Sequence, residues 1–567
     1  MAIHFRDHRG CELNAERPTT FHSAEARARD REAGLDASSA AREYQELAES
    51  MPFPEEVDWD DAPSQFKLYR GHPRIPLGYE NRTATAPADR VGLDRVGLDR
   101  VGQLLFDSYG VARYRWTAAD ALRRLIGTRG ADPPGGAKLA RNSLRPVPSG
   151  GSRFPAELYL VSAPDSGVAP GVHHYDAAHH ALVAVREGDW TAELAAGLGL
   201  PGTRASLTVL VSAFFWKNAF KYGDLTYRLC GLDCGVLVGQ LLEVVARYQL
   251  QARVSYQFVD DGLDRLLRLD PMRESVYAAI TIGELEESDA VPSDSGTRLT
   301  DDVLVSRTGG SSVSEPDWSL DLLPLQARVH RASRLPDRTS LRAEGAKQPV
   351  TASGVLSRAT LSLPRHRTDL LSGLSARRSS MGYFTPADMS LEALSALLAA
   401  AAQGYSNDLD QRQQSMQHTI LFCAVNRVSG VDPGVYRYRP ASADDEAGLE
   451  LVRAGDIGDE LQESLLIRLF NLTHANLCVY PVGDYGAGFE VYGDRWFRMQ
   501  NMEGGIMTQR LYLAAAALGL RCHASLGYDV RRTNRLLGVD GTGLTSLIQV
   551  MIGSGRAPGD FYEAAWQ

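Results

Sequence analysis

The chain has 567 residues, of which 44% are hydrophobic and 23% are charged, a balance typical of a soluble protein with two or three ordinary cores. Its formal net charge of −10 provides no basic surface for a phosphate backbone, which excludes nucleic acid as an expected partner. The residues Met1–Asp7 carry no apolar targeting segment, and the longest apolar run, Leu511–Leu520, is too short to cross a bilayer. We therefore expect a cytoplasmic protein with no membrane partner.

Residues 1–95 are predicted to form an N-terminal arm. One helix is expected over Ser38–Met51, because its residues are good helix formers and prolines follow directly after it. The segment Phe66–Leu77 is then predicted to be an ordered, extended stretch.

Residues 96–286 are predicted to form the first domain. A helix, three strands, a long helix and two further strands follow one another, and the clearest of these are Leu98–Tyr109, Leu158–Ser162, Gly171–Val185, Ala205–Ala213 and the helix Gly231–Leu250. Residues 287–357 are rich in serine, arginine, aspartate and proline and have little periodicity, so we interpret them as a linker or a partly ordered insertion.

Residues 358–567 are predicted to form a second domain with the same order of elements. The expected elements are Leu391–Gln403, Ile420–Arg427, Gly434–Tyr438, Leu477–Pro481, Met502–Leu520 and Leu547–Ile552. Helices around a mostly antiparallel sheet place both domains in the α+β class.

A repeated motif indicates that the two domains are copies of each other. The stretch 220–228 recurs as 490–498, so Tyr222 corresponds to Tyr492, and Gly283 corresponds to Gly553 at the same offset of 270 residues. A constant offset predicts a tandem duplication, and hence an intramolecular pseudo-dimer. Such a pair can form two sites at one interface and then lose one of them. The copies differ at Lys221, because the second copy has valine at the corresponding position.

The loop 145–160, with Ser149-Gly150-Gly151 near its centre, is followed by the Lys221-Tyr222 motif. This combination resembles the SagB-type branch of the nitroreductase-like flavoproteins, the azoline dehydrogenases of ribosomal peptide maturation. The resemblance covers most of the chain outside the linker and the extreme N-terminus. It implies a nitroreductase-like fold duplicated in tandem, an FMN cofactor, and Lys221 and Tyr222 as the catalytic signature.

The opening of the second copy, Arg377-Arg378-Ser379, resembles the segment with which the family holds the FMN phosphate, and Arg556 is placed like the family's C-terminal phosphate contact. An arginine fork offers bidentate donors to a phosphate, and a serine hydroxyl adds a third donor. An ordinary basic helix start explains the same residues equally well. The first copy ends with acidic residues, Glu284 and Glu286, where a phosphate would need cations.

The family places FMN between two subunits, so the resemblance implies one composite site. The second copy would hold the phosphate, and Ser149, Gly150 and Gly151 of the first copy would meet the edge of the ring. The turn Leu526-Gly527-Tyr528 resembles the family's turn that presents backbone groups to the flavin. A plain strand turn also accounts for Gly527. No metal site is predicted.

Oxidation of an azoline removes a proton from one ring carbon and two electrons with a hydrogen from its neighbour, so the protein must supply a base. Tyr222 is the candidate base, and the Lys221 ammonium would stabilise its phenolate. Asp224 and Arg228 recur in the second copy, so we interpret them as residues of the fold.

We therefore expect an FMN-dependent dehydrogenase that acts on a peptide or carrier-tethered substrate, with a cyclodehydratase or another modification enzyme as a candidate partner. An NAD(P)H-dependent nitro or quinone reductase is the alternative enzyme. A non-catalytic scaffold that binds a peptide within a modification complex is the alternative outside enzymes. The substrate, its ring type, the final electron acceptor, the number of FMN molecules per chain and the oligomeric state stay open.

Overall fold

The computed structural model describes most of both predicted copies. The described residues are 39–50, 57, 62–78, 97–118, 139–288, 304, 318–342, 360–366, 368–378, 383–409, 418–442, 445–467, 469–555 and 561–565. The predicted site residues Ser379 and Arg556 lie outside them, as does part of the predicted linker.

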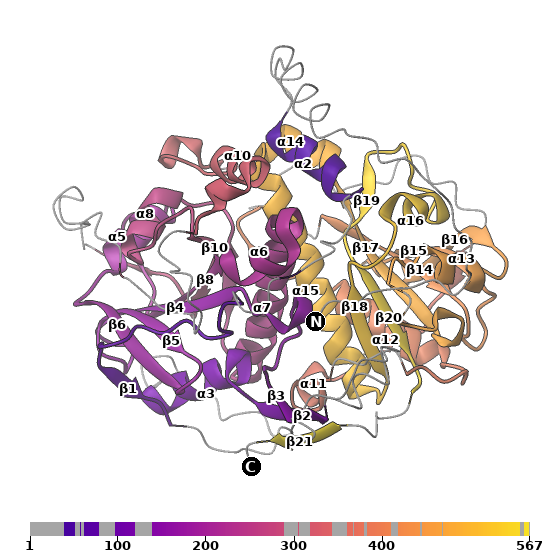
Figure 1. Cartoon of the computed structure of the whole chain (residues 1–567), viewed down its shortest axis with the longest axis horizontal. Coiled ribbons are helices and arrows are strands. Elements are labelled where there is room, and N and C mark those ends of the chain that lie inside the picture. Colours follow the sequence, from indigo (N-terminus) through magenta and orange to yellow (C-terminus); the bar gives the residue numbers. More distant parts are fainter. Residues whose placement is uncertain are drawn as a thin grey trace, which may run out of the picture.

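Two eight-stranded sheets form the two halves of the molecule, and their strands follow the same order (Figure 1). The first sheet has the order β1 (Arg74–Pro76), β6 (Ala181–Glu187), β5 (Gly171–Asp176), β4 (Ala156–Ser162), β8 (Leu207–Phe214), β10 (Glu274–Ile282), β9 (Ala252–Ser255), β13 (Ser406–Asn407). The second has the order β12 (Thr360–Ser362), β16 (Gly448–Ala454), β15 (Gly434–Arg439), β14 (Thr419–Val425), β17 (Leu477–Asp484), β20 (Gln549–Gly553), β18 (Arg521–Ser525), with β19 (Leu544–Ser546) also paired to β17. Neighbouring strands are antiparallel, except that β13 runs parallel to β9. The predicted strand over 171–185 is therefore a hairpin, β5 and β6, joined by a turn.

The predicted duplication is confirmed by the positions of the elements. Strands β8 and β17 begin and end 270 residues apart, and so do the helices α8 (Asp260–Leu266) and α16 (Val530–Leu536). The remaining helices of the two copies are α3 (Leu98–Tyr109), α5 (Thr191–Gly197), α6 (Trp216–Tyr222) and α7 (Thr226–Arg247), and α11 (Leu370–Ala376), α12 (Leu391–Ala401), α13 (Gly458–Ser464), α14 (Tyr485–Tyr492) and α15 (Arg495–Ala517). The class is α+β, as predicted.

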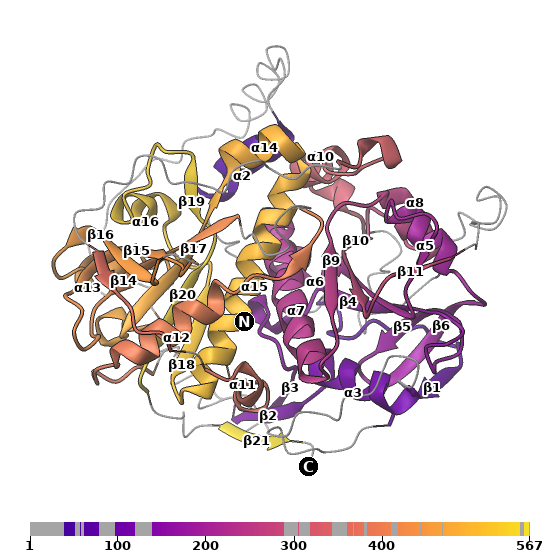
Figure 2. The ribbon, with the colours of Figure 1, turned by 180° about the vertical axis from the view of Figure 1, so that it is seen from behind.

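The two long helices, α7 and α15, lie side by side between the two sheets (Figures 1 and 2). Gly235 of α7 and Gly505 of α15 correspond to each other at the offset of 270 residues. A Cβ atom at Gly235 would fall less than 3.0 Å from the backbone of Met502, and one at Gly505 would fall equally close to the backbone of Leu232. The close approach of the two backbones thus requires glycine at both positions, and it forms the centre of the intramolecular pseudo-dimer.

The stretch that contains α6 and α7 is apolar on most of its surface. By length and composition the residues Trp216–Arg247 could cross a membrane, but 94% of their most apolar window is buried inside the protein. The apolar character of this stretch is therefore explained by its position in the core.

The copies also exchange elements at their edges. Strand β13 belongs to the second copy in sequence but joins the first sheet. Strand β21 (Phe561–Ala565), near the C-terminus, pairs with β2 (Arg113–Ala118), which pairs in turn with β3 (Leu139–Leu144). The two stretches 96–286 and 358–567 thus remain proposed domains, and strands β13 and β21 of the second pair with strands of the first.

Two short helices cover the repeated Tyr-Gly-Asp turns in a swapped arrangement. Helix α2 (Ala40–Ala48) precedes the first copy, but the Ala41 N–H donates to Asp494 of the second copy at 2.8 Å. Helix α10 (Pro324–Ala332) precedes the second copy, but Gln326 accepts from the Tyr227 N–H at 2.8 Å in the first. The helix expected over 38–51 is confirmed as α2, and α10 falls within the stretch 287–357 that we interpret as a linker or insertion.

The N-terminal arm is ordered over residues 62–78 and packs on the first sheet. The buried Lys67 ammonium donates to Tyr159 Oη at 2.6 Å and forms an ion pair with Glu274. Burial lowers the pKa of Lys67, but the Glu274 carboxylate outweighs that effect and the net pKa is raised. The arm is thus fixed to the sheet by the buried Lys67 ammonium, whose charge Glu274 neutralises.

Candidate active site

Lys221 and Tyr222 are the last two residues of α6, and both are half-buried. Gly223 ends this helix with a φ of 48°, and Gly493 takes a φ of 58° at the corresponding position of the second copy. Only glycine adopts such a left-handed conformation without strain, which explains why both copies keep it. The motif therefore begins a turn between two helices in each copy, and only the first copy places a lysine there.

The loop predicted to meet the flavin ring lies directly on Lys221 and Tyr222. Gly150–Ser152 form a single 3-10 turn, in which Gly151 has a φ of 55°. A Cβ atom at Gly151 would fall less than 3.0 Å from both Tyr222 Oη and Lys221 Nζ. The structure thus brings together the two segments that the sequence singled out about 70 residues apart.

The electrostatics of this pair differ from the prediction. Burial, and then the Arg153 guanidinium, lower the pKa of Lys221 to about 8. Burial raises the pKa of Tyr222 well above its ordinary value, and the Asp233 carboxylate adds to that effect. The Lys221 ammonium lies 4.9 Å from the centre of the Tyr222 ring, but it does not offset burial. Tyr222 is therefore a neutral phenol near pH 7, and Lys221 is the group that titrates close to it.

A buried carboxyl group that the sequence analysis missed lies beneath the loop. Asp233 of α7 accepts the Gly150 N–H at 3.3 Å, the Ser149 hydroxyl at 3.3 Å and the Asn218 amide at 3.5 Å. Burial raises the pKa of Asp233 to about 7, although these three hydrogen bonds lower it. An isolated acid in an apolar helix carries no local signal, because its partners are 15 and more residues away in sequence.

Arg377, a predicted phosphate ligand, lies at the interface of the two copies. It caps the C-terminal end of α11, is 4% exposed, and donates from Nη2 to the Arg145 carbonyl at 2.9 Å. Arg113 of the first copy donates to the Arg377 carbonyl at 3.2 Å, and Arg378 donates to the same oxygen at 2.9 Å. Four arginines from both copies therefore gather at this point.

Arg113 of this cluster retains an unused donor, and so does the guanidinium of Arg145, which bonds to the Gln65 carbonyl away from the cluster. Among the described residues, Nε of Arg113 and both Nε and Nη1 of Arg145 are buried without a hydrogen-bond partner. The Arg145 guanidinium lies 4.0 Å from the centre of the Tyr109 ring and 4.9 Å from that of Phe154. Buried donors without partners are costly in a folded protein, and an anionic ligand would satisfy them.

The described stretch that follows residues 379–382 lies beside the one that precedes residues 556–560. Phe384 forms a β-bridge with Gly555, and the Thr385 N–H donates to the Ser554 carbonyl at 2.8 Å. The opening and the end of the second copy therefore meet, which is the arrangement that the predicted phosphate contacts need. Ser379 and Arg556 as ligands remain predictions.

Gly527 follows β18, and its backbone groups bond within the protein. Its N–H donates to Ser525 Oγ at 2.9 Å, and its carbonyl accepts the Leu466 N–H at 2.9 Å. A ligand could bond to this backbone only by displacing Ser525 or Leu466. The role predicted for Gly527 remains a prediction.

Short chains of contacts join these separate residues across the interface. The Arg377 guanidinium lies 5.7 Å from the centre of the Tyr512 ring, and the Tyr512 hydroxyl accepts the Ala524 N–H three residues before Gly527. On the other side of Gly527, the Tyr528 hydroxyl donates to the Ser546 carbonyl, which also accepts from Arg228 of α7. Helix α7 then reaches the loop, because a Cβ atom at Gly150 would contact Leu229 at 3.2 Å. The arginine cluster, the Gly527 turn and the Lys221 loop thus form one continuous band along the interface.

The corresponding band of the first copy is closed by the protein itself. Tyr256 and Gln257 correspond to Leu526 and Gly527 at the offset of 270 residues. Their backbone N–H groups both donate to the buried Asp408 carboxylate, at 2.9–3.0 Å and 2.9 Å. The acids at the end of this copy do not meet a phosphate site either, since Glu286 pairs with Arg204 at 3.0 Å.

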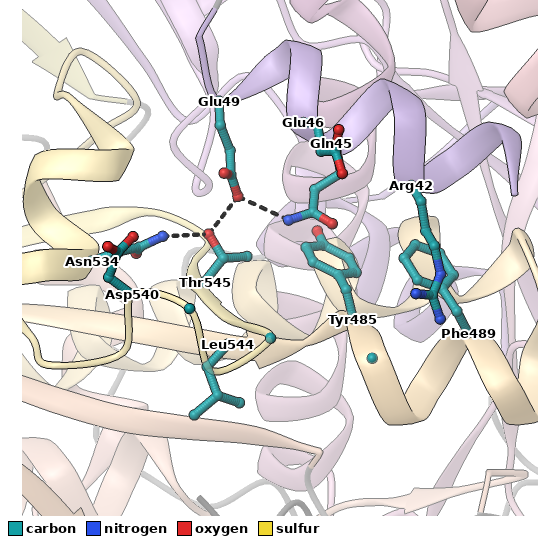
Figure 3. Close-up of a pocket in the computed structure, with 13 residues that line it drawn as sticks. Arg42, Gln45, Glu46, Glu49, Tyr485, Phe489, Asn534, Asp540, Leu544 and Thr545 are labelled. Carbon is teal, nitrogen blue, oxygen red and sulfur yellow. Dashed lines mark hydrogen bonds between the residues drawn. The ribbon is translucent and has the colours of Figure 1, made fainter. Parts of the chain in front are cut away.

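A cavity of about 270 Å³ lies between α2 and the second copy, and none of the predicted site residues lines it (Figure 3). On one side a row of hydrogen bonds runs from Gln45 through Glu49 and Thr545 to Asn534. The first copy has Asp264 and Ser275 at the positions of Asn534 and Thr545, and there the Arg334 guanidinium bonds to both. The cavity therefore marks a place where the two copies differ in their covering helix, away from the Lys221 motif.

The comparisons with known proteins agree with this architecture. Residues 374–555 match the family model described as the nitroreductase family. The trifolitoxin-processing protein TfxB of Rhizobium leguminosarum bv. trifolii is 27% identical over 143 residues, which are 24% of this chain and 38% of that protein. MJ1384 of Methanocaldococcus jannaschii, named as a nitroreductase, is 33% identical over 100 residues, which are 18% of this chain and 48% of that protein. The chain thus spans less than half the length of these curated relatives.

A crystal structure named as that of a nitroreductase from Anabaena variabilis resembles nearly the whole chain. It superposes with a TM-score of 0.65 at 23% sequence identity and covers 92% of this chain and 100% of that one. A likeness at this level of identity shows the fold. Residues 374–555 therefore form a nitroreductase family domain, and the chain as a whole has the nitroreductase fold.

Proposed function

We propose that this chain is an FMN-dependent oxidoreductase that removes two electrons from a heterocycle, such as a thiazoline or oxazoline, or from a related amino-acid unit. The observation that carries the proposal is the packing of the Ser149–Gly151 loop on Lys221 and Tyr222 at the interface of two copies, of which one has lost the lysine. The resemblance to azoline dehydrogenases, and a relative named for processing trifolitoxin, support a peptide or carrier-bound substrate. A cyclodehydratase or another modification enzyme as partner, and a cytoplasmic location, remain predictions.

The residues at the interface fit the proposed cofactor. A buried guanidinium donor of Arg113 without a partner among the described residues suits a phosphate, and Arg378 with Ser379 and Arg556 would complete its contacts. The loop 149–151 would meet the ring edge, since it lies in the same band. When bound, FMN would accept the two electrons and the hydrogen that accompanies them.

The asymmetry of the copies supports one cofactor per chain. In the first copy, the backbone N–H groups that correspond to the Gly527 turn already donate to Asp408, and Glu286 pairs with Arg204. Placing an anion beside the buried Asp408 carboxylate is unfavourable. The corresponding band of the first copy therefore has no role as a flavin site in this proposal.

The opposite directions of the two pKa shifts favour Lys221 as the base in this proposal. With a pKa lowered to about 8, its amine is neutral in part of the molecules near neutral pH and can take the proton that leaves the ring carbon. Tyr222 stays protonated and can donate a hydrogen bond that orients the heterocycle. This assignment replaces Tyr222 as the base by its neighbour and keeps both residues in the site.

The proposal is tested by asking which reagent reduces the bound flavin without oxygen. The FMN-loaded protein is mixed with a thiazoline-containing peptide or with NADPH, and the loss of oxidised-flavin absorbance is followed. Bleaching by the peptide, slowed at least about a hundredfold in Lys221→Met, is expected from the loss of a general base. Bleaching by NADPH alone would contradict the proposal in favour of a nitro or quinone reductase. A protein that binds no FMN would favour a scaffold.

A further inference from the structure

One side chain, Asp233, joins the loop over Lys221 and Tyr222 to α7. Gln65 of the N-terminal arm donates to the Ser152 carbonyl of the loop at 2.6 Å. The Ser149 hydroxyl and the Gly150 N–H both bond to the Asp233 carboxylate, and the Ser149 Oγ accepts the Phe154 N–H at 2.8 Å, which closes the loop on itself. Asn218 of α6 donates to the same carboxylate, so Asp233 joins the loop, α6 and α7. No other described hydrogen bond runs from Ser149 or Gly150 to α7.

Resting on the proposed function, we infer that Asp233 is the positioning residue of this site: its carboxylate fastens Ser149 and Gly150 to α7 and thereby sets where Gly151 lies on Lys221 and Tyr222. Gly151 follows Gly150 directly and has no free space around it, because it already contacts the Lys221 ammonium and the Tyr222 hydroxyl. A small shift of Gly150 therefore moves the loop against Lys221 Nζ and Tyr222 Oη. Such displacements are large on the scale that positions reacting groups.

The second copy shows that the fold uses an acid at this point for the same purpose. Glu503 corresponds to Asp233 at the offset of 270 residues, and it is likewise buried on the central helix. Its two carboxylate oxygens accept the His418 N–H at 2.9 Å each and also bond to Thr419, at the start of β14. The hydrogen bonds of Asp233 are longer, at 3.3–3.5 Å, so the carboxylate of the first copy holds its loop more weakly.

Because Asp233 carries a carboxyl group, its hydrogen bonds to the loop respond to protonation. Burial raises the pKa of Asp233 to about 7, and Tyr222 of α6, Tyr109 of α3 and Cys230 and Cys234 of α7 are the titratable groups that face it. No described lysine or arginine forms an ion pair with it. Burial in the closed loop raises the pKa of Asp233 more than the hydrogen bonds lower it, so the closed loop binds the proton more tightly than an opened, solvated loop does. The loop is therefore held more firmly below pH 7 than above it.

Hydrogen exchange of the isolated, flavin-free protein tests this inference. The protection factor of the peptide that contains Ser149–Gly151 is measured from pH 5.5 to pH 8.5 and corrected for the intrinsic exchange rate. In the wild type we expect it to fall about tenfold as the pH rises through 7, because the opened loop releases the Asp233 proton more readily than the closed loop does. In Asp233→Asn we expect a flat profile, and in Ser149→Ala, which removes one donor to the ionised carboxylate, a larger fall.

The matched control is Glu503→Gln, which changes the corresponding acid of the other copy and should leave the profile of the loop unchanged. A fall that persists in Asp233→Asn, or one abolished equally by Glu503→Gln, would overturn the inference. FMN binding is titrated in the same variants by flavin fluorescence. Since the exchange step needs no flavin, a normal profile without FMN binding would refute the proposed function alone.

Discussion

Adding one methyl group at Gly151 tests the contact between the loop and the Lys221 motif. In Gly151→Ala, the added Cβ would fall less than 3.0 Å from Tyr222 Oη and Lys221 Nζ, so at least one of these groups must move. Alanine at a φ of 55° also costs about 1 kcal/mol of unfolding free energy through backbone strain. We expect the strain to appear as lost stability, and the displacement to appear as a fall in turnover of about a hundredfold.

Gly493→Ala separates the two effects. Gly493 has a φ of 58°, and a Cβ atom there would have nothing within 4 Å. The two variants should therefore lose about the same 1 kcal/mol in urea unfolding, while only Gly151→Ala loses turnover with the thiazoline-containing peptide. Equal turnover in the two variants would refute the contact between the loop and the Lys221 motif.

Three further predictions concern the pseudo-dimer. In Gly505→Ala the new Cβ meets the backbone of Leu232, so thermal unfolding should show a loss of about 3 kcal/mol or more. Gly262→Ala, whose Cβ would make only ordinary contacts at 3.8 Å or more, should be neutral. Arg498→Ala leaves the buried Asp260 with one fewer partner and should lower the free energy of unfolding by about 3 kcal/mol in urea at pH 7. Because the pKa of Asp260 is lowered to about 2, the stabilisation by its ion pairs is present above pH 4 and is lost as the pH falls towards 2. The difference in unfolding free energy between the variant and the wild type should therefore shrink at pH 2. The pKa of Asp408 is raised to about 6, so its contribution to the free energy of unfolding is full below pH 4 and is lost as the pH rises through 6. Asp408→Asn should therefore remove a decline of about 3 kcal/mol in the unfolding free energy over that interval. An unchanged decline would contradict the burial of this carboxyl.

The duplication and most elements could be predicted because they depend on local patterns. The apolar run of α7 and the strands that stop at Ile-Gly repeat at one offset, and both follow from burial along the chain. The swapped helices α2 and α10 and the exchange of β13 could not be predicted, because pairing between distant segments leaves no periodic signal.

The candidate site was predicted in its residues more than in its chemistry. The sequence indicated Lys221, Tyr222 and the loop at Gly151, and the structure places them in contact. It did not indicate Asp233 or the direction of the pKa of Tyr222, because burial is a property of the whole fold. The resemblance could suggest a lysine that stabilises a phenolate, but only the environment decides which of the two groups titrates near pH 7.

The flavin content of the purified protein tests the central claim most directly. FMN is added in excess, unbound flavin is removed, and the cofactor is then released and quantified against the protein concentration. One FMN per chain, lost in Arg378→Ala, is the result expected from a single composite site across the interface. Two per chain would contradict the closure of the first band by Asp408, and none would contradict the flavin site itself.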